Sequence, residues 1–141
     1  MGHDATKILL GSSQSTAKEI DNRAGVIAAG LATRLKSDGT ISTAKADGSL
    51  LGISAGKSLS DTSRTAIFRS GLRVPVLLKT GFTTPAIGAQ VAIDDTSGEA
   101  IAYTGTGDTY VNAVYVSGLM TGVKEDGTTQ NCALIDFQGG L

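Results

Sequence analysis

Glycine divides this chain into short segments, and their length restricts the folds open to it. The sequence has 19 glycines in 141 residues. Thr-Gly, Ser-Gly and Asp-Gly steps recur about every eight to twelve residues, which is the spacing of short strands joined by turns. Because glycine weakens helix interiors and supplies the positive φ of tight turns, helices are disfavoured. The sequence therefore predicts an all-β fold, a small barrel or sandwich of short strands joined by Asp-Gly and Gly-rich turns.

Seven segments between these breaks show two-residue alternation or compact apolar character, and we predict them to be strands. They are residues 31–36, 50–54, 65–70, 72–79, 89–93, 110–116 and 133–137. Within 72–79, Pro75 has no N–H to donate to a neighbouring strand, so this segment is expected at a sheet edge or beside a bulge. An edge strand is also a place where a partner can add a strand of its own.

The pattern Lys-x-Asp-Gly-Ser/Thr occurs three times, at residues 36–40, 45–49 and 124–128. Asp-Gly supplies the backbone conformations of tight hairpin turns, and the flanking Lys and Thr suit exposed strand ends. The sequence therefore predicts three hairpins at these positions.

The N-terminal stretches are less regular. Residues 1–16 contain one brief apolar patch, Ile8, Leu9 and Leu10, and are expected to form an extended arm ahead of a single β-rich domain at 17–141. Residues 15–30 begin with polar and charged residues that suit a helix start, but two glycines weaken a helix there. A short helix, an irregular loop and a strand all remain open for that stretch.

The charge balance argues against nucleic acid as a partner. The chain has 12 Lys and Arg against 13 Asp and Glu, a net charge of -1, whereas nucleic-acid binders usually carry a clear basic excess. No apolar run approaches the ~20 residues that span a bilayer, so no membrane partner is expected. The N-terminus lacks the apolar stretch of an export signal, which predicts synthesis in a reducing cytoplasm.

Few residues suit catalysis or metal binding. Cys132 and His3 are the single cysteine and the single histidine, which excludes an internal disulfide and a Cys/His zinc site. The Gly-Lys-Ser within residues 52–58 resembles a phosphate loop, but three residues separate its glycines where that motif needs four. Asp94, Asp95 and Glu99 are a dense acidic group, but residues 94–98 have the composition of a turn. We expect no catalytic residue, no cofactor and no metal.

A run of basic residues indicates one contact surface. Between residues 64 and 79 the chain carries four basic residues and no acid, and these would form a basic rim if segments 65–70 and 72–79 paired. Such a rim is either an ordinary solvated face or a contact for an acidic protein partner. The residues predicted to contact a partner are Ile8, Leu9, Leu10, Arg64, Arg69, Arg73, Pro75 and Lys79.

Four segments follow one another in an order that carries a family resemblance. They are an Asp-Gly hairpin within residues 30–41, a Leu-Gly-Ile strand at 49–54, a Gly-Leu-x-Val strand at 70–76 and a Gly-x-x-Val-x-Ile-Asp strand before a turn at 85–98. This order resembles the small capsid decoration, or cement, proteins of tailed bacteriophages. The similarity covers roughly residues 25–125.

The resemblance implies an all-β, barrel-like fold without enzymatic activity. It also implies self-association, commonly as a homotrimer with a dimer left open, and attachment to the major capsid protein. Such proteins lie on the outer surface of the virion at junctions between capsomers and are made in the host bacterial cytoplasm. A clamp that binds only the expanded head stabilises it against internal DNA pressure by mass action.

A β-rich carbohydrate- or receptor-binding module on a virion or cell surface is the main alternative. Such modules share this size and strand content, but they usually expose aromatic rings on which sugars stack. The chain has no Trp, three Tyr and three Phe. An enzyme is the third interpretation, and an acidic pocket in the structure would be its minimal support.

Overall fold

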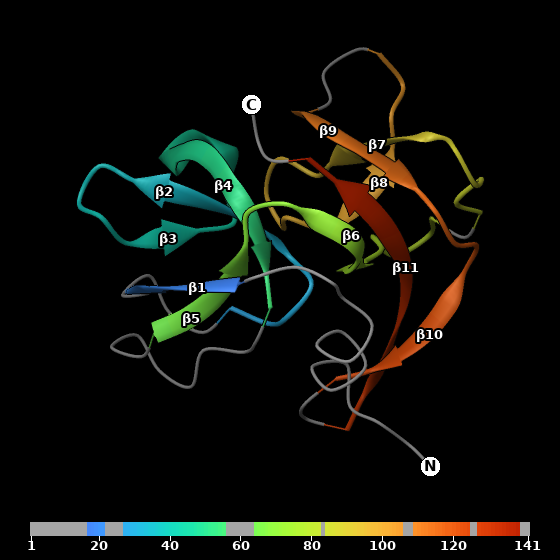
Figure 1. The fold of residues 1–141 in the computed structure, drawn as a ribbon, viewed down its shortest axis with the longest axis horizontal. Coiled ribbons are helices and arrows are strands. Elements are labelled where there is room, and N and C mark those ends of the chain that lie inside the picture. Colours follow the sequence, from blue (N-terminus) through green and yellow to red (C-terminus); the bar gives the residue numbers. More distant parts are fainter. Residues whose placement is uncertain are drawn as a thin grey trace.

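The fold is described from a computed structural model. It describes residues 17–21, 27–55, 64–82, 84–105, 109–124 and 127–138, with the backbone alone at 17–21, 64–65 and 109–110. The prediction of an all-β fold is confirmed (Figure 1). The strands are β1 (Ala17–Asp21), β2 (Ala32–Lys36), β3 (Ile41–Ser42), β4 (Gly48–Ser54), β5 (Arg64–Phe68), β6 (Gly71–Leu77), β7 (Gln90–Ile93), β8 (Ala100–Ala102), β9 (Thr109–Tyr115), β10 (Met120–Val123) and β11 (Thr129–Phe137).

The strands form two antiparallel sheets. One has the order β1-β5-β4-β2-β3, and the other has the order β10-β11-β9-β7-β8 with β6 paired to β11. The second sheet curls until the chain after β6 meets β8, where Leu78 and Ala100 form a single parallel bridge. At that seam the N–H of Lys79 donates to the carbonyl of Ala100 over 3.0 Å. The curled sheet is the right-hand half of the molecule in Figure 1.

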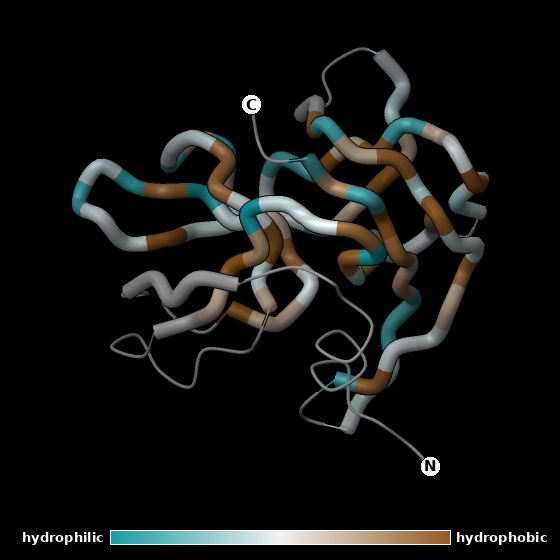
Figure 2. The backbone as a smooth tube through the Cα atoms, viewed as in Figure 1, coloured by the Kyte–Doolittle hydropathy of each residue, from teal (hydrophilic) through white to brown (hydrophobic). Residues whose placement is uncertain are grey.

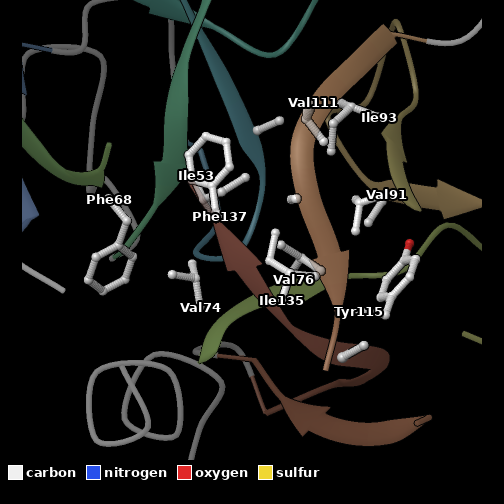
Figure 3. Packing of buried hydrophobic residues seen from close by; sticks show 14 of the residues in the cluster. Ile53, Phe68, Val74, Val76, Val91, Ile93, Val111, Tyr115, Ile135 and Phe137 are labelled. Carbon is white, nitrogen blue, oxygen red and sulfur yellow. The ribbon is translucent and has the colours of Figure 1, made fainter. Parts of the chain in front are cut away.

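One hydrophobic core joins the two sheets. Ile53 and Phe68 come from the five-stranded sheet, and they belong to the same buried cluster as Val76, Tyr115 and Phe137 of the curled sheet (Figure 3). Fully burying side chains of this size stabilises a fold by roughly 1.5–3 kcal/mol each relative to leaving them exposed. Figure 2 shows brown, hydrophobic stretches along these strands.

A smaller apolar cluster covers the opposite face of the five-stranded sheet. Ile67 belongs to it although its neighbour Phe68 belongs to the main core, because successive residues of a strand point to opposite faces. Leu51 joins the small cluster through a bulge, since Thr33 pairs with Gly52 while Arg34 pairs with Leu50. Both faces of this sheet are therefore packed.

All seven predicted strands are confirmed with shifts of a few residues at their ends. In the stretch 15–30, left open by the sequence, the structure has a strand, β1, which pairs antiparallel with β5. The sequence did not predict β3, β8 and β10. These strands have only two to four residues, too few to show a period.

Two of the three predicted hairpins are confirmed. The turn at 36–40 joins β2 to β3, where Lys36 N–H donates to Thr40 O over 2.8 Å and Gly39 has a φ of 86°. The turn at 124–128 joins β10 to β11 through the matching bond from Lys124 N–H to Thr128 O, also 2.8 Å. The hydrophilic tip of the first hairpin projects at the left of Figure 2.

The hairpin prediction at 45–49 is wrong, because β2 lies between β3 and β4. Leu35 pairs with Ile41 on one side and with Ser49 on the other. The chain crosses the end of β2 through a short 3-10 helix, η1 (Lys45–Asp47). Gly48 then meets β2 so closely that a Cβ there would lie 1.9 Å from the carbonyl oxygen of Leu35. This glycine serves a close backbone approach rather than a hairpin turn.

Candidate binding surface

β6 is an edge strand with a bulge, as Pro75 predicted. Among the described strands it pairs only with β11. Val74 faces Ile135 and Gly71 faces Phe137, so three steps along β6 match two steps along β11. The extra residue falls at Leu72 and Arg73, and Arg73 is the one non-glycine residue with positive φ, 57°, in the described part of the chain.

At residues 75 and 77, the outward edge of β6 has no backbone donor to offer a partner's strand. The N–H of Leu78 donates to Asn131 of β11, so by alternation the N–H groups of residues 77 and 75 point away from that strand, whereas the bulge at residues 72 and 73 breaks the alternation. Leu77 N–H donates to Gly30 O over 2.9 Å, Pro75 has no N–H, and Arg73 N–H donates to Oδ1 of Asp136 over 3.0 Å. The expectation that a partner adds a strand here is corrected: this edge is protected.

The bulge instead exposes two side chains, those of Leu72 and Arg73, to solvent. Leu72 is 53% exposed and Arg73 is exposed beside it. With Val116 and Asp136 they line an open hollow of about 350 Å³, which we call the Arg73 surface. A left-handed backbone at a non-glycine residue costs about 1–2 kcal/mol, and here the Asp136 carboxylate fixes it by accepting the Arg73 N–H. Strain of this kind clusters at ligand clamps and binding sites.

A second, smaller hollow shares Asp136 with the Arg73 surface. It has a volume of about 180 Å³ and contains the exposed Val114, with amide side chains around it, namely Gln90, Asn112 and Gln138. The Nε2 of Gln90 already donates to the carbonyls of Val111 and Ala113, at 2.9 and 3.3 Å. The lining of this smaller hollow contains no aromatic ring. This hollow therefore lacks the stacking platform on which a glycan site usually depends.

The structure separates the predicted contact residues. Because β5 and β6 lie in different sheets, the basic rim expected from their pairing does not form. The two residues between them, Arg69 and Ser70, carry the chain from one sheet to the other, and both are exposed. Pro75 is buried, so its side chain cannot meet a partner in this conformation. Ile8, Leu9, Leu10 and the side chain of Arg64 lie outside the described residues.

Lys79 lies at the seam where the chain after β6 meets β8, away from the Arg73 surface, and it forms an ion pair with Asp94. Its Nζ is 2.5 Å from Oδ2 of Asp94. Asp94 begins the predicted turn at 94–98, which is confirmed, and its Oδ1 accepts the N–H groups of Thr96 and Ser97. The Lys79 ammonium and these amides hold the pKa of the Asp94 carboxyl well below its usual range. The Asp94 carboxylate therefore stabilises both the turn at 94–98 and the seam at Lys79.

Cys132 is a buried residue of β11, and burial raises the pKa of its thiol. Within the described ranges, no group of His, Cys, Asp and Glu side chains could hold a metal ion. The same ranges contain no helix long and apolar enough to cross a membrane.

Sequence reasoning missed Leu72, Val116 and Asp136. One signal was available for Asp136, because it is the single charge in the apolar segment 133–137. Its partner Arg73 lies 63 residues away in the chain, and no local pattern links the two. No protein family matches this chain, and no curated protein matches it in sequence.

Proposed function

We propose that this protein is a capsid decoration protein that binds the outer surface of an expanded phage head at capsomer junctions. The observation that carries the proposal is the Arg73 surface: a strained, exposed arginine fixed by Asp136 beside an exposed leucine at the rim of a hollow. The resemblance in segment order and the barrel-like all-β fold support the same function.

The chemistry of this surface suits a protein partner. Arginine beside an apolar pocket is the combination found at energetic centres of protein interfaces. Arg69 and Arg73 are both exposed, and the one acid lining the hollow, Asp136, already accepts the Arg73 N–H. The partner that fits is a segment of the major capsid protein with an acidic and an apolar side chain.

A modest affinity at each contact is sufficient for this role. Binding that occurs only on the expanded shell stabilises that state by mass action. A head offers many copies of the same junction, so small contact free energies add up over the shell. The protein thereby opposes the pressure of packaged DNA without any chemical step.

The test uses heads of the phage that encodes this chain, prepared without the protein in expanded and unexpanded forms. Purified protein is added, and the amount that sediments with the heads is measured. We expect saturable binding to expanded heads, and at least about tenfold weaker binding for Arg73→Gly. Lys45→Ala is the control, because it also removes one exposed positive charge but lies in η1. Equal binding by both variants, or none by the wild type, would overturn the proposal.

A further inference from the structure

The edge strands of the two sheets differ in how they are protected against pairing with another chain. β3 has two residues, and β1 carries three charged residues among its five. The outward donors of β6 are used or missing, and β8 has three residues with Ala100 already held by Lys79 N–H. Short length, charge, proline and bulges are the devices that keep sheet edges from pairing.

β10 is longer than β3 and β8, and it lacks the charge, proline and bulge that protect β1 and β6. Its four residues, Met120, Thr121, Gly122 and Val123, contain no charge and no proline, and they pair with β11 in unbroken register. The same ladder continues to Lys124, whose N–H donates to Thr128 O.

The free backbone groups of β10 are those of Thr121 and Val123. Because Lys124 N–H points to β11, alternation turns Gly122 and Met120 toward that strand and turns Thr121 and Val123 away from it. Within the described part of the chain β10 has no second neighbour. Thr121 is exposed, and so is Leu119, at 47%, just before the strand.

We infer that β10 is a self-association site, at which a second copy of this chain adds its own β10 in antiparallel orientation. With Thr121 of one copy opposite Val123 of the other, the N–H and C=O groups of each residue bond the partner across a two-fold axis. Two copies of β10 can lie side by side because the strand bears no charge, so no like charges meet across the contact. Lys124, whose Nζ bonds Gln130 Oε1, then lies opposite Met120 of the second copy rather than opposite a like charge.

This contact goes beyond the proposed function and does not depend on it. It favours a dimer, whereas the resemblance implies a trimer more often. It also leaves the Arg73 surface on β6 free, because β10 and β6 lie on opposite sides of β11.

The test measures the mass of the full chain by sedimentation velocity over a range of concentrations, together with hydrogen exchange at the Val123 amide. We expect a species of twice the 14.3 kDa chain mass and an amide that exchanges more slowly as the dimer forms. Thr121→Pro removes an outward N–H and no bond to β11, so it should raise the dissociation constant about tenfold or more. Ala102→Pro is the matched control on the outward edge of β8.

Thr121→Lys serves as a second variant if the proline variant fails to fold, since it adds an edge charge without changing the backbone. The inference is wrong if the wild type stays monomeric, or if it forms a trimer or dimer that Thr121→Pro and Thr121→Lys leave intact. Fast exchange at the Val123 amide in a confirmed dimer would also overturn it, because that dimer would use another surface.

Discussion

Lys79 and Asp94 hold the barrel seam together, with the Lys79 Nζ 2.5 Å from the Asp94 Oδ2. Lys79 follows β6 and Asp94 follows β7, and the single bridge between Leu78 and Ala100 lies beside them. The side chain of Gln130 adds to the seam by donating to Leu78 O over 3.1 Å and to the Glu99 carboxylate. Side-chain contacts thus stabilise the seam between the chain after β6 and β8, where the backbone forms only a single bridge.

Asp94→Asn should make the free energy of unfolding depend less steeply on pH in the acid range. The pKa of Asp94 is depressed in the fold by Lys79 and the turn amides, so the native state binds fewer protons than the unfolded state. Its contribution is complete above the unfolded pKa, near pH 4, and is lost as the pH falls further. We expect a loss of roughly 1 kcal/mol at pH 7 and a shallower decline below pH 4, measured by urea unfolding.

Lys79→Met checks that the same ion pair is responsible. Lys79 is the largest cause of the lowered Asp94 pKa, so its loss should flatten much of the acid profile, while the Thr96 and Ser97 amides keep the rest. The double variant should be little worse than Asp94→Asn alone. Additive losses of unfolding free energy would show that the two side chains stabilise the seam independently.

Arg73→Gly should weaken binding to expanded heads while leaving the free energy of unfolding nearly unchanged. Glycine adopts a φ of 57° without the strain that arginine bears there, although it also gives the unfolded chain more freedom. These effects oppose each other, so we expect an unfolding free energy within about 1 kcal/mol of the wild type. Thermal unfolding provides the measurement. A large destabilisation would mean that the Arg73 side chain is structural.

Gly98 should tolerate no side chain, because it joins the two sheets. The N–H of Ala32 donates to Gly98 O over 2.8 Å, and a Cβ at Gly98 would lie 2.5 Å from Ala32 O. We expect Gly98→Ala to lower the unfolding free energy by about 2 kcal/mol or more. Gly39→Ala is the control, since its φ of 86° is similar but its Cβ would meet nothing within 4 Å. Equal losses in the two variants would show that backbone conformation alone sets the penalty.

Tyr115→Phe should remove a hydrogen bond from the barrel core. The buried Tyr115 hydroxyl donates to Ile101 O over 2.8 Å, and burial raises its pKa. We expect a loss of roughly 1 kcal/mol. A group whose pKa is raised in the fold contributes stability below its unfolded pKa, near pH 10, and loses it at higher pH. An ultraviolet titration should therefore lose its most alkaline component in this variant.

The sequence predicted the strands that carry a period and missed what depends on distant residues. Buried and exposed residues alternate along segment 110–116, whereas segment 133–137 is marked by its compact apolar run. β10 is too short for either pattern, and its role as an edge depends on the order of the strands. Pro75 correctly marked an edge with a bulge. The conformation of Arg73, however, depends on a carboxylate 63 residues away, so residue types near position 73 do not encode it.

The Asp-Gly turns show the same limit. Gly39 and Gly48 occur in nearly identical local sequences, but the first forms a hairpin and the second enters a strand beside β2. The difference arises because β2 is paired on both sides. Turn chemistry predicts where a chain can reverse, and strand order decides whether it does.

The most direct measurement of the proposed function is cryo-electron microscopy of expanded heads with and without this protein. We expect added density for this protein over the junctions between capsomers, with Leu72 and Arg73 facing the major capsid protein. Heads that look the same in both preparations, or a bound barrel with the Arg73 surface turned to solvent, would contradict it.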